Sequence, residues 1–123
     1  MQNISNAQIV DFINATGTLS GKRLPLKLSF ALKFNLKLAV ETYKAYDEAR
    51  NELLKTQKEN PAAFNQAFGE LLSEEVKLAV KTVPVEVIEL TDTAEYDTLT
   101  FGELNAIDFM IVEENEDEHP ECS

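Results

Sequence analysis

Few side chains in this 123-residue sequence could carry out covalent or acid–base chemistry. Nucleophilic catalysis needs a nucleophile within reach of a general base. The chain has one histidine, His119, and one cysteine, Cys122, and both lie in the closing stretch EENEDEHPECS. That stretch has almost no apolar side chains with which to hold the two groups in a fixed geometry. We therefore predict no catalytic pair there.

The sequence also predicts no metal site and no cofactor. A structural zinc site needs four Cys or His ligands, and the chain has two such residues. The acids from Asp92 to Asp97 lack the central glycine and the spacing of a calcium loop. The four glycines occur singly, so none of them builds a phosphate-binding loop. These absences favour binding over catalysis, and we expect a protein that is not an enzyme.

Charge is divided unevenly along the chain, whose net charge is −11. Residues 1–58 have nine basic and five acidic side chains, a net charge of +4, whereas residues 59–123 have two basic and seventeen acidic side chains, a net charge of −15. Such a split gives part of the surface a strong field of one sign. The acidic half would repel phosphates, so direct nucleic-acid binding is not expected.

Composition points to an ordinary globular domain, with 44% apolar and 27% charged residues. The first ten residues lack the basic and apolar regions of a signal peptide. The most apolar stretch, 24–40, contains Lys27, Lys33 and Lys37, which argues against a membrane span. We expect a cytoplasmic protein with one helical domain at 1–112 and an acidic disordered tail at 113–123.

The long stretch at residues 26–57 is ambiguous. Its first part alternates apolar and polar residues, which on its own is typical of a strand. It is far longer than a strand, however, and is rich in Leu, Lys and Ala, which favour a helix. We predict one continuous helix, supported by ion pairs between Lys37 and Glu41 and between Lys44 and Glu48.

That helix would be apolar on two sides and would need cover on both. One face has Leu28, Leu32, Leu36, Ala39, Tyr43 and Tyr46, and the nearly opposite face has Leu26, Phe30 and Phe34. We expect other elements of the chain to cover both faces. The alternative is that Leu26, Phe30 and Phe34 form a surface for a partner or for self-association.

Shorter elements flank the long helix. A capping box of Ser5 and Gln8 predicts a helix at 6–15 that stops at Gly17. Asn60 and Pro61 predict a second start, a helix to Leu72 that forms a hairpin with the long helix.

The C-terminal half adds the β content of a mainly α fold with a small β element. β-branched residues predict a short strand at 76–81 and an extended segment at 83–88 around Pro84. An acidic loop at 91–97 follows, and a capping box of Thr100 and Glu103 begins a last helix that reaches Ile111.

Several short motifs together resemble a family of short proteins of unknown function from tailed phages and prophages of Gram-positive bacteria. These motifs are Leu24-Pro25-Leu26-Lys27, Tyr46-Asp47-Glu48-Ala49-Arg50, Glu70-Leu71-Leu72 and Leu104-Asn105-Ala106-Ile107-Asp108-Phe109-Met110-Ile111. The resemblance covers most of residues 4–112. It implies a viral gene product that acts in the bacterial host, and it favours a helix at 26–40. It supplies no catalytic residues.

These observations predict a non-enzymatic, phage-encoded protein that binds another macromolecule, for example as an inhibitor of a host or defence protein. The expected contact residues are Leu26, Phe30 and Phe34, with an electrostatic surface formed by Glu86, Glu89, Asp92, Glu95 and Asp97. The partner would be a host or phage protein, or a second copy of the chain. One alternative is a self-assembling accessory or assembly protein of the virion, and another is a small-molecule sponge.

Overall fold

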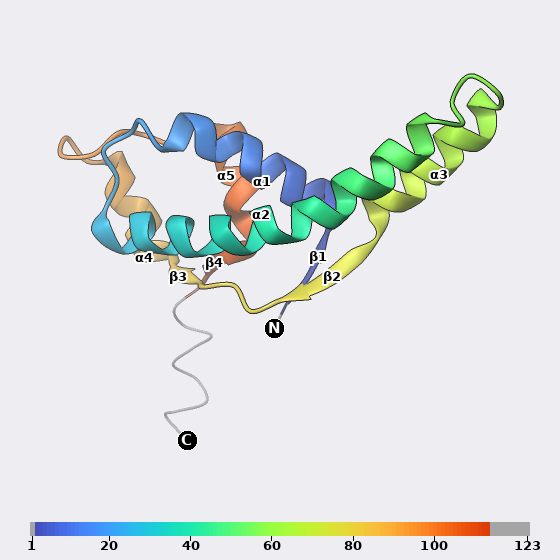
Figure 1. Cartoon of the computed structure of the whole chain (residues 1–123). Helices are drawn as coiled ribbons and strands as arrows, with labels where there is room; N and C mark the ends of the chain where they lie inside the picture. Colours follow the sequence, from blue (N-terminus) through green and yellow to red (C-terminus); the bar gives the residue numbers. More distant parts are fainter. Residues whose placement is uncertain (1, 114–123) are drawn as a thin grey trace.

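The computed structural model describes residues 2–113, so the predicted tail lies outside the described residues except for Glu113. The fold is mainly helical with a small β element, as predicted (Figure 1). In chain order the elements are β1 (Gln2–Ser5), α1 (Asn6–Leu19), α2 (Leu26–Leu54), α3 (Pro61–Ser73), β2 (Glu75–Leu78), β3 (Val83–Pro84), α4 (Val85–Glu89), the 3-10 helix η1 (Leu90–Asp92), α5 (Phe101–Ile107), the 3-10 helix η2 (Asp108–Met110) and β4 (Ile111–Val112).

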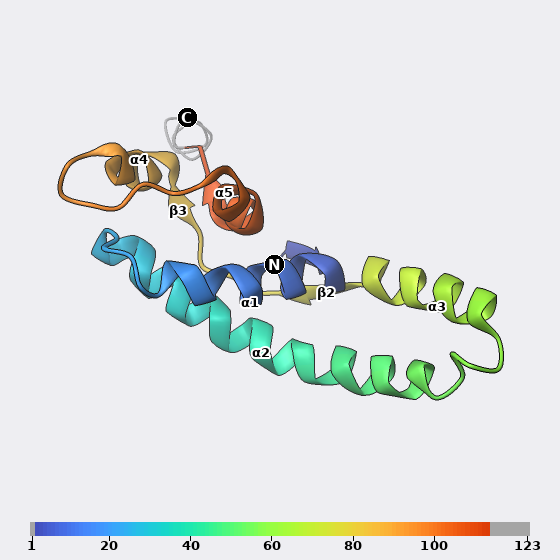
Figure 2. The same cartoon turned by 90° about the horizontal axis from the view of Figure 1, so that it is seen from above.

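The α2 helix confirms the prediction of one continuous helix in place of a strand. It has 29 residues and ends three residues before the predicted end, since residues 55–57 form turns. Its first half packs against α1, and its second half packs antiparallel to α3 (Figure 2). The end of α2 and α3 together form a projecting arm, residues 47–73. The face predicted to pack inward does so, with Leu28 fully buried and Tyr46 only 6% exposed. Helix propensity therefore outweighed the alternating pattern.

The α1 helix runs four residues past its predicted end. Gly17 does not stop it, because no glycine in residues 2–113 adopts the left-handed conformation that such a stop requires. The hydroxyls of Thr16 and Thr18 donate to the carbonyls of Ile13 and Ala15, which keeps both residues within the helical turns. Leu19, at the end of the helix, is almost fully buried, so core packing stabilises the extra turn.

An unpredicted strand, β1, precedes α1. Strand β1 pairs antiparallel with β2, with Ile4 opposite Val76. Ile4 is buried in the core as part of this strand. The capping box of Ser5 and Gln8 is present directly after β1, as predicted.

The extended segment predicted at 83–88 is wrong beyond Pro84. Only Val83 and Pro84 are extended, and the helix α4 begins at Val85. Val87 and Ile88 are both buried in the common core, and a helical turn brings these two β-branched side chains inward together. Tertiary packing thus overrides their preference for strands.

The end of the described chain returns to the same region. The capping box of Thr100 and Glu103 starts α5 as predicted, but the helix ends at Ile107 and does not reach Ile111. Ile107 and Met110 are fully buried, and β4 pairs parallel with β3, with Val112 opposite Pro84. The last described residues therefore lie beside β3.

The ion pairs of α2 differ from those predicted. In the described chain they join residues three apart, namely Glu41 with Lys44, Asp47 with Arg50 and Glu52 with Lys55. These pairs are exposed or half-exposed, so each contributes little to stability. Among residues 2–113, no helix is both long and apolar enough to span a bilayer.

Candidate functional site

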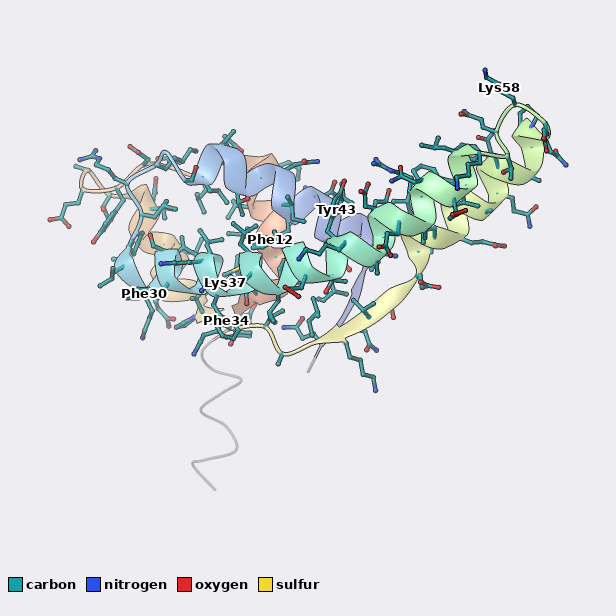
Figure 3. The ribbon with its side chains drawn as sticks, viewed as in Figure 1. Phe12, Phe30, Phe34, Lys37, Tyr43 and Lys58 are labelled. Atoms are coloured by element: carbon teal, nitrogen blue, oxygen red, sulfur yellow. The ribbon has the colours of Figure 1, made fainter. Side chains whose placement is uncertain are left out.

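The outer face of α2 is not covered by the rest of the described chain. Leu26, Phe30 and Phe34 are 69%, 62% and 41% exposed. In Figure 3, Phe30 and Phe34 project from the same side of α2, away from the core residue Phe12. The expectation that other elements cover both apolar faces of this helix is therefore wrong, because the segment after β2 runs past only one edge of the face.

That segment is held in place by a buried amide. The Asn35 side chain is 2% exposed, and its Nδ2 donates to the carbonyl of Lys81 over 2.8 Å. The backbone N–H of Lys81 donates back to Asn35 Oδ1 over 2.7 Å. Lys81 belongs to no strand, so no neighbouring strand is available to bond its backbone. The Asn35 amide satisfies its N–H and C=O instead. It fixes the backbone of Lys81 against α2.

The side chain of Lys81 then lies over the outer face. Its ammonium group is 5.3 Å from the centre of the Phe34 ring, within the range of a cation–π contact. Phe34 is consequently less exposed than Phe30, four residues earlier on the same face.

Between α2 and residues 81–84 the surface forms a groove of about 620 Å³. We name it the Phe–Lys groove. Its lining comprises Phe30, Phe34, the lysines Lys27, Lys33, Lys37 and Lys81, and the small or apolar residues Ala31, Thr82, Val83 and Pro84. Two aromatic rings are thus surrounded by four positive charges, and no acidic residue belongs to the lining. The groove is basic although the whole chain has a net charge of −11.

The sequence predicted the two phenylalanines as contact residues, but it did not predict the lysines around them. Lys27, Lys33 and Lys37 argued against a membrane span, and Lys37 was predicted to pair with Glu41, but none of the three was predicted to line a binding surface. The signal was present, because Lys27, Phe30, Phe34 and Lys37 follow one another at intervals of three or four residues and so share a helix face. The fourth lysine, Lys81, had no such signal, because the fold brings it from a distant segment.

The predicted acidic surface is separate from the groove. Glu86 and Glu89 are exposed on α4, Asp92 is exposed on η1, and Glu95 is exposed in the following loop. None of them lines the Phe–Lys groove. Leu26, at the first turn of α2, is not part of the lining either.

Asp97 differs from the other four acids of the predicted surface, because its carboxylate accepts a hydrogen bond from another residue of the described chain. Its carboxylate accepts from the backbone N–H of Arg23 over 2.7 Å and lies 3.7 Å from the Arg23 guanidinium. The backbone N–H of Asp97 donates to the Arg23 carbonyl over 2.9 Å. Asp97 therefore fastens the loop before α5 to the segment that leads into α2.

Among the acids of residues 2–113, Glu103 alone has a strongly shifted pKa, and its contacts stabilise the fold. Burial alone would raise the pKa of its carboxyl. Bonds from Lys22 Nζ (2.6 Å), the Thr100 backbone N–H (2.9 Å) and the Thr18 hydroxyl (2.7 Å) outweigh burial and, with the charge of Lys22, lower the pKa to about 2. The carboxylate stays ionised and joins the start of α5 to the end of α1. The capping box predicted only the Thr100 contact.

A smaller hollow of about 300 Å³ lies between α1 and the start of α2. Leu19, Leu24, Leu32 and Leu36 contribute its apolar lining, and Lys22 and Lys33 contribute charge. If the chain sequesters a small molecule, as in the sponge alternative, this hollow suits an anion with an apolar body.

No group of three His, Cys, Asp or Glu side chains within residues 2–113 is arranged to hold a metal ion. His119 and Cys122 lie outside the described residues. Comparisons with protein-family models, with curated proteins and with solved structures found no match to this chain. The resemblance to phage proteins stays a prediction.

Proposed function

We propose that this chain is a non-enzymatic binding protein that docks a segment of another protein in the Phe–Lys groove. The observation that carries the proposal is the pair of exposed phenylalanines, Phe30 and Phe34, surrounded by four lysines without an acid. The matching segment would combine at least one apolar side chain with several carboxylates. Following the resemblance, we further propose that the chain acts in the cytoplasm of a bacterial host, where a phage would use it to inhibit a host or defence protein.

The energetics of the groove favour such a segment. Burying a phenylalanine side chain contributes about 1.5–3 kcal/mol, and both rings retain much of their exposed area for a partner to cover. The lysines would accelerate the encounter with an acidic segment and set its orientation more than its affinity. One wall is already fixed by Asn35, so docking requires little ordering of the groove.

Aromatic rings beside lysines also occur in sites for single-stranded nucleic acid, where bases stack on the rings. Two observations favour a protein partner over this alternative. The net charge of −11 and the four acids exposed on α4, η1 and the loop that follows oppose an oligonucleotide, which has a charge on every phosphate, more strongly than a peptide segment with a few carboxylates. We expect no measurable binding of a single-stranded oligonucleotide at physiological salt.

A peptide-display selection tests the proposal. Random linear peptides selected on the wild-type chain should converge on sequences that pair an aromatic or aliphatic residue with Asp or Glu. The Phe30→Ser, Phe34→Ser variant should select no such motif. The matched control is Phe101→Ser, which removes a phenylalanine that is 79% exposed outside the groove, and it should select the same motif as wild type.

Three results would contradict the proposal. The first is that peptides selected on wild type share no motif. The second is that the groove variant and the control select the same motif. The third is that wild type binds an oligothymidylate tightly and the groove variant does not. The third result would assign the groove to nucleic acid.

Self-assembly is the second candidate, because the groove is basic while the acids of α4 and η1 on another copy are negative and exposed. Contacts of unlike surfaces between copies would produce open chains or rings. Analytical ultracentrifugation in low salt separates the two candidates. A monomer at micromolar concentration contradicts assembly, whereas oligomers abolished by Lys33→Glu with Lys37→Glu would favour it over docking of a foreign segment.

A further inference from the structure

The described chain ends at the wall of the Phe–Lys groove. Val112 pairs with Pro84 in the parallel β3–β4 ladder, and Pro84 belongs to the lining of the groove. Whatever follows Glu113 therefore starts one strand away from that wall. The ten residues that follow include five acids, one histidine and no lysine or arginine; the acids are Glu114, Glu116, Asp117, Glu118 and Glu121.

We infer that residues 114–123 dock on the lysines of the groove in their own chain. The segment has five carboxylates and the groove has four ammonium groups, so their charges are complementary. Ten residues span at most about 33 Å when extended, which is enough to cross the groove from a starting point at its edge. Attachment through Val112 gives the segment an effective concentration of about millimolar, so weak ionic contacts suffice to hold it.

The match covers only part of the groove. Pro120 and Cys122 are the only apolar residues of the segment, and neither can fill the space over both Phe30 and Phe34. The acids therefore neutralise Lys27, Lys33, Lys37 and Lys81 while leaving the aromatic rings largely uncovered. A partner segment with an apolar anchor would compete successfully because it satisfies both features.

This partial match makes the segment a selective competitor. It would exclude ligands that are merely acidic and yield to those that are acidic and apolar, which is a form of discrimination against the wrong partner. This consequence rests on the proposed docking function. The contact between the segment and the groove does not.

The single cysteine, Cys122, allows a direct measurement on the full chain. A nitroxide attached to its thiol broadens the NMR signals of nearby amides. At about 0.01 M salt, where the Debye length is about 30 Å, amides of residues 27–37 and 81–84 should lose most of their intensity. At about 1 M salt, where it is about 3 Å, the intensity should return. Residues 111–113 adjoin the segment covalently and are not diagnostic.

Two variants test whether the lysines hold the segment. Lys33→Glu with Lys37→Glu should abolish the broadening in the groove. Lys55→Glu with Lys58→Glu, the same charge change on two exposed residues between α2 and α3, should leave it intact; Figure 3 shows Lys58 at the end of the arm, far from Phe30 and Phe34. Glu116→Gln, Asp117→Asn and Glu118→Gln together should also abolish it while leaving the folded part of the chain unaltered.

Broadening that is independent of salt and of Lys33 and Lys37, or equally strong at Lys55 and Lys58, would overturn the inference. So would broadening seen only between chains, when an isotope-labelled Cys122→Ser chain is mixed with a spin-labelled chain, because it would assign the segment to the groove of another copy. The peptide selection remains a separate test of the docking function. It can fail while the segment contact holds, or succeed while the contact is absent.

Discussion

The side-chain amide of Asn35 bonds to both backbone polar groups of Lys81, accepting from its N–H over 2.7 Å and donating to its C=O over 2.8 Å. Asn35 thus holds Lys81, which comes from the C-terminal half of the chain, against α2 at the edge of the Phe–Lys groove. The same amide also lies 3.4 Å from the sulfur of the buried Met110. Asn35 therefore connects the core to the proposed binding surface.

Asn35→Ala should destabilise the fold by about 2–4 kcal/mol, because it leaves two partly buried backbone groups of Lys81 without partners and opens a small cavity. Asn35→Asp should destabilise the fold at least as much, since it retains the acceptor for the Lys81 N–H but places a buried carboxylate oxygen against the Lys81 carbonyl. Urea unfolding measures both changes. The control is Asn51→Ala on the exposed side of the same helix, and a similar loss for Asn51 and Asn35 would contradict this account.

The contribution of Glu103 to stability should depend on pH. Its pKa is about 2 in the folded chain against 4.5 when unperturbed, so the folded state favours the ionised form. That stabilisation, on the order of 3 kcal/mol, is fully present above pH 4.5 and is lost as pH falls toward 2. Urea midpoints of wild type and Glu103→Gln at pH 7, 4 and 2.5 should therefore converge on acidification. A difference that stays constant across this range would contradict the proposed ionic role.

The two kinds of phenylalanine should respond differently to truncation. Phe12 is 1% exposed and meets the edge of Phe109 at 5.2 Å between ring centres, so Phe12→Ala should destabilise the fold by about 3–5 kcal/mol. Phe30→Ser should change the free energy of unfolding by no more than about 0.5 kcal/mol, because its ring is largely in water. Thermal unfolding of both variants checks the contrast. A large loss for Phe30→Ser would show that its ring supports the fold and would remove it from the proposed docking surface.

The projecting arm, residues 47–73, should open locally before the rest of the chain. Phe64, stacked on Phe68 at 5.8 Å, is its only buried residue, whereas residues 28–39 of α2 contribute Leu28, Ala31, Leu32, Asn35 and Ala39 to the buried interior. Segments with so few buried contacts open at low free energy. Amide hydrogen exchange should therefore be faster by at least tenfold in residues 48–72 than in residues 28–39. Phe64→Ala should accelerate exchange in the arm alone, and uniform protection along α2 would contradict this expectation.

Local sequence signals predicted the elements that depend on neighbouring residues. The caps at Ser5, Asn60 and Thr100 all receive the backbone hydrogen bonds expected of them. Each cap involves groups within three residues, so it can be recognised without knowing the fold. Helix propensity likewise resolved the alternating stretch correctly.

Features that depend on distant residues were missed. Strand β1 exists because β2, more than seventy residues later, pairs with it, and α4 is helical because its valine and isoleucine side chains turn toward a common core. The two phenylalanines of the groove could be identified from their spacing. The basic character of the groove could not be fully identified, since Lys81 comes from a distant segment that Asn35 holds against α2.

The α2 helix joins the groove and the arm in one continuous element. The groove occupies the first turns of this helix and the arm its last turns, and from Phe30 to Leu54 the rise of an α-helix amounts to about 36 Å. A binding event or a bulky tag at the arm tip, residues 57–59, would thus stay well clear of a segment seated on Phe30 and Phe34. Because one continuous helix holds both sites, partial opening of the arm would shorten the ordered part of that helix from the end opposite the groove and would leave Phe30 and Phe34 in place.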